Sequence, residues 1–172
     1  ISGGPSPTAL AESLGRRLPL LLRGVDWIVI AGSDEEQVAG LAGAIDRFAL
    51  GAVLMAAPPG GRAFQALADR LTERQYPIVP AQVGHALDLG GGSRLEVLGL
   101  GPRGAVLGLT YRRARIVLAS GADPSLLQDL MDSPKVNEAT ALLLCEGGGP
   151  VLNPEAWLAG VHPRVALISV DA

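Results

Sequence analysis

Three adjacent carboxylates, Asp34, Glu35 and Glu36, follow an apolar run and precede a helical pattern. Carboxylate oxygens are the ligands that hard cations prefer, so this acidic group could hold such a cation. The same residues also suit the first turn of a helix, where the helix dipole favours negative charge. Ser33 and Glu36 have the S-x-x-E spacing of a capping box, and the segment is therefore interpreted as a helix cap.

Two glycine-rich segments are candidates for phosphate binding. Residues 99–104 match G-x-G-x-x-G, but a dinucleotide site needs a helix next, and the apolar run at residues 105–109 indicates a strand. Residues 146–149 follow another apolar run, and a glycine loop that enters a helix can bind an anion through its backbone. However, Glu146 would repel a phosphate, and no Lys, Ser or Thr completes a P-loop. Both segments are interpreted as chain connections.

Nitrogen and sulfur ligands are scarce. His85 and His162 are far apart in the sequence and lack ligand-spaced partners, whereas a zinc site needs three or four ligands. We therefore predict no ordinary zinc site and no cofactor. Cys145, the single cysteine, lies in an apolar run and is expected to be a small buried hydrophobic residue. No nucleophile-elbow pattern supports a Ser-His-Asp triad.

Hydrophobic periodicity predicts the elements that position these residues. Strands are predicted at residues 27–30, 52–55, 77–80, 93–98, 105–111, 115–119, 139–144 and 165–170. Helices are predicted at residues 5–18, 35–48 and 62–74, and two more are predicted to begin at Asp123 and after a cap at Asn153. Ser6 and Pro7 mark the start of the first helix, and Gly51 is expected to end the second. The alternating first half predicts a parallel sheet, and the strand-rich middle predicts a second sheet.

Composition indicates a folded domain and argues against a nucleic-acid binder. Of 172 residues, 48% are hydrophobic and 18% charged, which excludes a disordered chain. The net charge is -3 and the basic residues are scattered, whereas nucleic-acid binders carry a clustered basic face. The densest cluster, Arg112, Arg113 and Arg115, is interpreted as a solvated hairpin tip, with a phosphate contact as the alternative. No signal peptide is expected, and no run approaches the about 18 apolar residues of a membrane helix.

In the order of these elements, the chain resembles the metallo-β-lactamase-like domain of the ComEC family of DNA-uptake proteins. Residues 163–170 are similar to the final strand of that family, and residues 3–10 and 87–98 are also similar to family segments. The resemblance implies an α/β (α+β four-layer) fold, an αββα sandwich with two mixed β-sheets. It also implies a single domain over residues 1–172, with N-terminal strands missing or truncated, as a fragment of a longer protein.

The resemblance does not extend to the metal-binding motifs. Active relatives carry a pattern like T-H-P-D-A-D-H-I-G-G, and residues 31–40 here retain only Asp34 of its metal-binding types. Active relatives also carry four short motifs, "IDGG", "T-G-D", "HHGS" and "NDNS". Here the aspartates of the first two are replaced, the second at a position two places before Asp123. The histidines and the "HHGS" loop are replaced too, and "NDNS" is lost near residues 101–105. The degenerate positions are Ser2, Gly32, Asp34, Glu36, Gln37, Gly121, Glu146 and Gly147.

The resemblance thus implies a catalytically inactive domain with a structural or binding role and no metal. Its expected partners are DNA or other subunits of a DNA-uptake apparatus, with no lipid binding by this segment. It would be the soluble, extracytoplasmic domain of a bacterial inner-membrane protein, and an open sheet edge would allow a homodimer. The alternatives are a metal-dependent hydrolase or nuclease that uses Asp34, Glu36 and Glu146, and a nucleotide-binding α/β domain based on the glycine loops.

Overall fold

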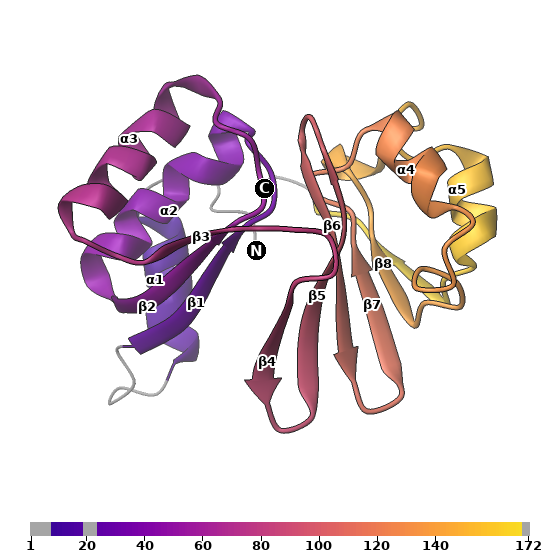
Figure 1. Ribbon diagram of the computed structural model, residues 1–172, viewed down its shortest axis with the longest axis horizontal. Helices are drawn as coiled ribbons and strands as arrows, with labels where there is room; N and C mark the ends of the chain where they lie inside the picture. Colours follow the sequence, from indigo (N-terminus) through magenta and orange to yellow (C-terminus); the bar gives the residue numbers. More distant parts are fainter. Residues whose placement is uncertain (1–7, 19–23, 170–172) are drawn as a thin grey trace. The chain divides into compact units, whose positions relative to one another are not determined.

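The computed structural model describes residues 8–18 and 24–169 of the chain. The backbone forms two compact units, Ile1–Pro80 and Ala81–Ala172 (Figure 1). Each unit has its own sheet, its own helices and its own cluster of buried apolar side chains. The expectation of more than one sheet is therefore confirmed.

The first unit contains three helices and a three-stranded parallel sheet of order β1-β2-β3. Its elements are α1 (Ala9–Arg17), β1 (Gly24–Ile30), α2 (Glu35–Arg47), β2 (Ala49–Met55), α3 (Gly61–Glu73) and β3 (Ile78–Pro80). Apolar residues at helical spacing, such as Val38, Leu41 and Ile45 of α2, lie in one core with Val53 and Phe64. This unit is the parallel, alternating structure that the first half of the sequence predicts.

Gly51 does not end a helix, as the sequence suggested, but lies inside β2. A Cβ atom at this position would lie 2.5 Å from the carbonyl oxygen of Asp26 on the paired strand β1. Glycine inside a strand commonly marks such a close backbone approach. The predicted cap of the first helix, Ser6 and Pro7, lies outside the described residues, and the helix begins at Ala9.

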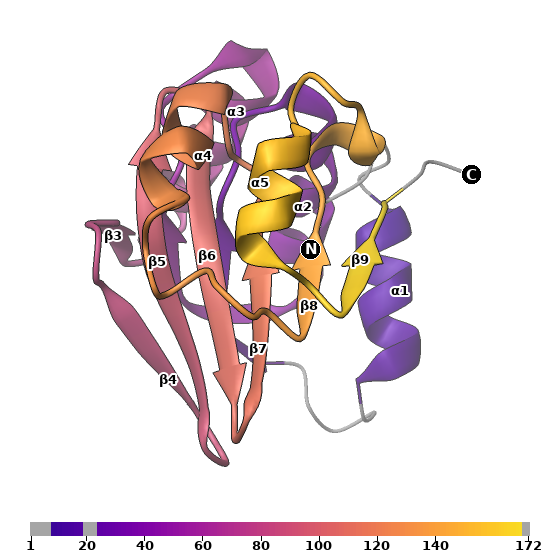
Figure 2. The ribbon, with the colours of Figure 1, turned by 90° about the vertical axis from the view of Figure 1, so that its right-hand side faces the viewer.

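The second unit is built on a six-stranded mixed sheet of order β4-β5-β6-β7-β8-β9. Its elements are β4 (Ala86–Gly90), β5 (Ser93–Gly101), β6 (Gly104–Tyr111), β7 (Ala114–Leu118), α4 (Pro124–Leu130), β8 (Ala141–Leu143), the 3-10 turn η1 (Glu146–Gly148), α5 (Glu155–Val161) and β9 (Val165–Leu167). Strands β4 to β7 are antiparallel neighbours, and β7, β8 and β9 run parallel. Helices α4 and α5 cover one face of this sheet (Figure 2).

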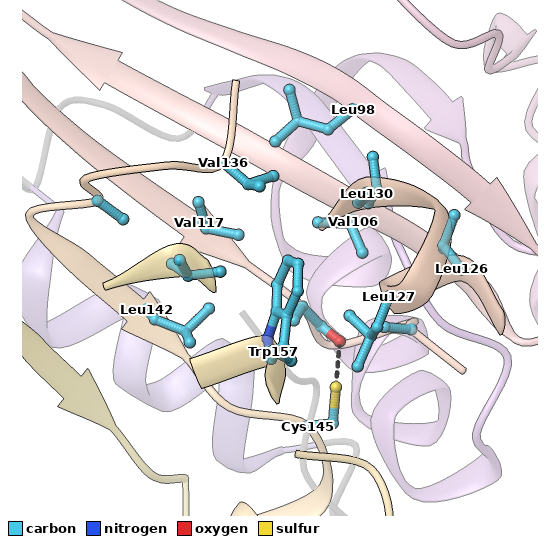
Figure 3. Packing of buried hydrophobic residues seen from close by; sticks show 14 of the residues in the cluster. Leu98, Val106, Val117, Leu126, Leu127, Leu130, Val136, Leu142, Cys145 and Trp157 are labelled. Carbon is cyan, nitrogen blue, oxygen red and sulfur yellow. Dashed lines mark hydrogen bonds between the residues drawn. The ribbon is translucent and has the colours of Figure 1, made fainter. Parts of the chain in front are cut away.

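The core of the second unit lies between these two helices and the sheet. Trp157 of α5 is fully buried and packs among aliphatic side chains from α4 and from strands β5 to β8 (Figure 3). The labelled members of this cluster are Leu98, Val106, Val117, Leu126, Leu127, Leu130, Val136, Leu142 and Cys145. Helices as short as α4 and α5 are only marginally stable in isolation, so side-chain packing against the sheet supplies most of their stability.

Strands β4 and β9 of this unit differ from the sequence expectation. Strand β4 was not predicted, because most of its side chains are exposed and no alternation marks it. Strand β9 ends at Leu167, earlier than predicted, while residue 170 lies outside the described residues. Among the described residues, β9 pairs with β8 at the end of the sheet. The predicted association of two copies through an open sheet edge stays a prediction. No helix within residues 8–18 and 24–169 is long and apolar enough to cross a membrane.

Candidate functional site

The first group of candidate residues lies between the carboxyl end of β1 and helix α2. Gly32 is buried and takes part in a backbone β-bridge. The N–H of Val38 donates to the carbonyl oxygen of Asp34 at 3.1 Å, and α2 begins at Glu35. Helix α2 therefore begins directly after Asp34. The capping box of Ser33 and Glu36 stays a prediction, because the side chain of Glu36 lies outside what the structure describes.

The Glu35 carboxylate has a structural partner that the sequence did not predict. Its Oε1 atom accepts a hydrogen bond of 2.7 Å from the backbone N–H of Arg62, in the first turn of α3. The N-cap of α3 is Gly60, which has no side chain to perform this role. A Cβ atom on Gly61 would lie 2.5 Å from Glu35 Oε1, so the glycine leaves room for the carboxylate. Glu35 thus caps a helix other than its own.

Replacement of Glu35 by Ala is expected to lower the free energy of unfolding by about 1 kcal/mol, because α3 loses an acceptor at its N-terminus. Glu35→Gln, which keeps an amide oxygen, should lose less. The exposed Glu73, at the last residue of α3, gives the control variant Glu73→Ala, with a change below about 0.5 kcal/mol. Urea denaturation of the three variants measures the effect, and equal losses for Glu35→Ala and Glu73→Ala would contradict the capping role.

The second group of candidate residues lies at the carboxyl ends of β7 and β8. These strands are parallel neighbours, so the loops that follow them leave the same edge of the sheet. Gly121 follows β7; it is buried and its N–H donates to the carbonyl oxygen of Ala105 at 3.3 Å. Gly147 follows β8 in the turn η1, with a positive φ of 62° that glycine adopts readily. Gly121 therefore contributes a backbone hydrogen bond and Gly147 a backbone conformation, and neither contributes a side chain.

Asp123 lies beside this edge, and its side chain is only 6% exposed. Its Oδ1 atom accepts hydrogen bonds from Ser125 N–H at 3.0 Å, from Leu126 N–H at 3.2 Å and from the Ser125 hydroxyl. Asp123 is therefore the N-cap of α4, as the sequence predicted. Its Oδ2 atom has no hydrogen-bond partner within the described part of the chain, and a Cβ on Gly101 would clash with it.

Hydrogen bonding keeps this buried carboxylate ionised. The hydrogen bond from the Ser125 hydroxyl holds the pKa of Asp123 below its usual value, against the opposing effect of burial. The backbone N–H groups of Leu126 and Ser125, and the positive charge of Arg103, act in the same direction. The Asp123 carboxylate is therefore a charged group with a structural task.

Cys145 is the small buried residue that the sequence predicted. Its thiol donates to the carbonyl oxygen of Ala119 at 2.8 Å (Figure 3), and burial raises its pKa to about 11. A thiol with such a pKa carries almost no thiolate at neutral pH and is a poor nucleophile or metal ligand.

Asn153 does not cap α5, as the sequence suggested, because that helix begins after Pro154. Its side-chain oxygen accepts from Cys145 N–H at 2.9 Å, and its amide nitrogen donates to the carbonyl oxygens of Cys145 and Gly149 at 3.0 and 2.8 Å. The side chain thereby fixes the loop after β8. The only feature of the sequence that could have indicated this role is the position of Asn153 after the glycine loop.

The G-x-G-x-x-G segment is a strand connection. Strand β5 ends at Gly101, β6 begins at Gly104, and these two glycines pair across the turn formed by Pro102 and Arg103. A strand, and not a helix, follows the last glycine, so the segment lacks the helix N-terminus of a dinucleotide site. This excludes the nucleotide-binding interpretation of residues 99–104.

No protein-family model and no curated protein matches the sequence. Solved structures do match. CmlA, a diiron β-hydroxylase from Streptomyces venezuelae, aligns over 88% of this chain and 36% of its own length, with 11% identity and a TM-score of 0.57. YhfI from Bacillus subtilis, a metallo-β-lactamase fold protein, aligns over 94% of this chain and 73% of its own, with 11% identity and a TM-score of 0.56. The chain has the metallo-β-lactamase fold. A diphosphatase of the PhnP family aligns over 96% of this chain and 67% of its own, with 12% identity and a TM-score of 0.52.

Three of the positions that the resemblance assigns to metal ligands are glycines. Gly32, Gly121 and Gly147 have no side chain, whereas metals in proteins are held by imidazole, thiolate or carboxylate groups. In the described part of the chain, no three His, Cys, Asp or Glu side chains are grouped so as to hold a metal ion. Ser2 and the side chains of Glu36, Gln37 and Glu146 lie outside what the structure describes.

Proposed function

We propose that this chain is a catalytically inactive metallo-β-lactamase-fold domain with a structural or binding role in a ComEC-like DNA-uptake protein. The observation that carries the proposal is the loss of ligand atoms. Glycine stands at positions 32, 121 and 147, and Gln37 stands where active relatives carry a histidine. An amide is a poor substitute for an imidazole, and glycine offers no side-chain ligand.

The structural tasks of the neighbouring side chains support the same proposal. The carboxylate of Glu35 caps α3, the carboxylate of Asp123 caps α4, and the thiol of Cys145 is buried and protonated. Side chains that already stabilise the fold can be retained without metal binding. The partners in this proposal are DNA or other subunits of the uptake apparatus, because residues 3–10, 87–98 and 163–170 resemble the ComEC family.

Metal analysis tests the inactive domain directly. After dialysis against zinc and manganese salts and then against metal-free buffer, the purified protein is expected to retain substoichiometric metal, because three of its ligand positions are glycine. It should not hydrolyse bis-p-nitrophenyl phosphate or DNA, and Asp34→Ala should leave both results unchanged. A metallo-β-lactamase-fold enzyme with intact ligands, treated in parallel, is the positive control.

The competing function, a hydrolase with Asp34, Glu36 and Glu146 as carboxylate ligands, predicts the opposite result. It requires about one metal ion or more per chain and a hydrolytic activity that Asp34→Ala abolishes. Either observation would overturn the proposal of an inactive domain.

A further inference from the structure

Two hairpin turns lie side by side at one end of the six-stranded sheet (Figure 1). The first joins β4 to β5 through residues 90–93, and the second joins β6 to β7 through Arg112 and Arg113. Ser93, at the start of β5, pairs with Tyr111, at the end of β6, so the two turns are direct neighbours. Residues that are distant in the sequence therefore share one exposed surface.

This surface, the hairpin end, combines exposed apolar and cationic side chains. Its members are Leu89, Arg94, Tyr111, Arg112 and Arg113, and all five are exposed. Leu89 is 48% exposed and Tyr111 is 45% exposed, although both have large, mostly apolar side chains. The guanidinium carbon of Arg112 lies 5.3 Å from the centre of the Tyr111 ring, so the two side chains are held together.

The local charge is positive although the chain as a whole carries -3. Residues 86–95 and 109–115 contain a single carboxylate, that of Asp88, which accepts a hydrogen bond from Gly90 N–H at 2.9 Å. Asp88 lies opposite Arg94 in the register of β4 and β5. Arg115 does not belong to the surface, because its guanidinium donates to the carbonyl oxygens of Pro134 and Lys135. The predicted three-arginine cluster is therefore divided, and only two of its members lie at the tip.

We propose that the hairpin end docks on an anionic phospholipid surface. Guanidinium groups match the geometry of phosphate, and Tyr and Leu side chains suit the boundary between headgroups and acyl chains. A single-stranded nucleic acid would also use the arginines and the Tyr111 ring, but it would leave Leu89 without a role. The presence of the exposed Leu89 at the same end of the sheet as the arginines favours the lipid surface.

This inference does not depend on whether the domain binds metal or has catalytic activity. It is an alternative to the expectation, drawn from the resemblance, that this segment binds no lipid. The sequence could not indicate the surface, because only the pairing of β4 with β5 and of β5 with β6 places Leu89, Arg112 and Arg113 at the same end of the sheet. Each arginine near an anionic surface contributes a factor of about five to the partition coefficient.

Sedimentation with large unilamellar vesicles tests the proposal. At low salt, the full chain is expected to bind vesicles of phosphatidylcholine with phosphatidylglycerol, and not vesicles of phosphatidylcholine alone. High salt should weaken the binding, because it screens the charges. The double variant R112E/R113E should lose at least about 25-fold in partition coefficient. The control variant R47E/R62E changes two exposed arginines of the first unit by the same charge and should stay within about twofold of the wild type.

Two further variants keep the test decisive if the double variant does not fold. Arg94→Gln removes one positive charge outside the turn, and Leu89→Ser removes the apolar contact; each should weaken vesicle binding with unchanged circular dichroism. Equal binding to both kinds of vesicle, an equal loss in R47E/R62E, or no binding at all would overturn the proposal. Binding of a single-stranded oligonucleotide through Arg112 and Arg113, without vesicle binding, would overturn it in favour of a nucleic-acid surface.

Discussion

Replacement of Trp157 by Ala is expected to lower the free energy of unfolding by about 3–5 kcal/mol. The Trp157 side chain is 0% exposed and is among the largest fully buried side chains of the protein. It joins α5 to the aliphatic residues of α4 and of the six-stranded sheet (Figure 3). A cavity of that size cannot be filled by movement of the neighbours, because a close-packed interior relaxes only partly. Urea denaturation followed by far-UV circular dichroism measures the loss.

Trp157→Phe separates the packing contribution from the polar group. The indole Nε1 atom is buried and has no hydrogen-bond partner in the part of the chain that the structure describes. Phe keeps most of the ring and removes this unpaired donor, so its cost should be well below that of Ala. Val151 is 79% exposed, and Val151→Ala is the control, with a change below about 0.5 kcal/mol. Similar losses for Trp157→Ala and Val151→Ala would show that Trp157 is not a central core residue.

The sequence predicted best those elements whose pattern reports burial directly. Helix α3 was predicted from Phe64, Leu67 and Leu71, and all three are buried. The Gly99–Gly104 segment was correctly interpreted as a strand connection from the strand that follows it. Strand β4 was missed because its exposed side chains leave no apolar alternation, and backbone pairing with β5 holds it in the sheet.

Glycine was harder to interpret from sequence, because its role depends on what approaches it in space. At Gly51, the same residue type that ends helices instead allows a close contact between β1 and β2. At Gly61, it makes room for the carboxylate of Glu35 from a preceding helix. Neither contact can be predicted from local spacing, since each joins residues that are distant along the chain.

The candidate site follows the same rule. The sequence identified the changed ligand positions through a resemblance to known motifs, but it could not show what the remaining side chains do. Glu35 was interpreted as part of its own helix start, whereas its acceptor role serves Arg62, 27 residues further on. Asn153 was interpreted as a cap, whereas it holds the loop after Cys145. Side-chain hydrogen bonds across the fold are what local propensity does not contain.

Asp123→Ala is expected to lower the free energy of unfolding by about 2 kcal/mol, at the upper end of the range for a helix cap. The substitution removes the acceptor of three hydrogen bonds at the start of α4 and leaves buried N–H groups unpaired. Asp129, exposed on the same helix, supplies the control Asp129→Ala, which should stay within about 0.5 kcal/mol of the wild type. Urea denaturation at neutral pH measures both variants.

The pH dependence tests the charge of this carboxylate separately from its shape. The pKa of Asp123 is lower in the folded protein than in the unfolded chain, mainly through the hydrogen bond from Ser125. Its stabilising contribution is therefore fully present above the unfolded pKa of about 3.9 and is lost as the pH falls through the lower folded pKa. Asp123→Asn cannot ionise, so the stability difference between the wild type and Asp123→Asn should shrink between about pH 5 and pH 2. A difference that is constant over this range, while the protein stays folded, would mean that Asp123 acts as a neutral cap. The orphan Oδ2 atom beside Gly101 would then carry the proton.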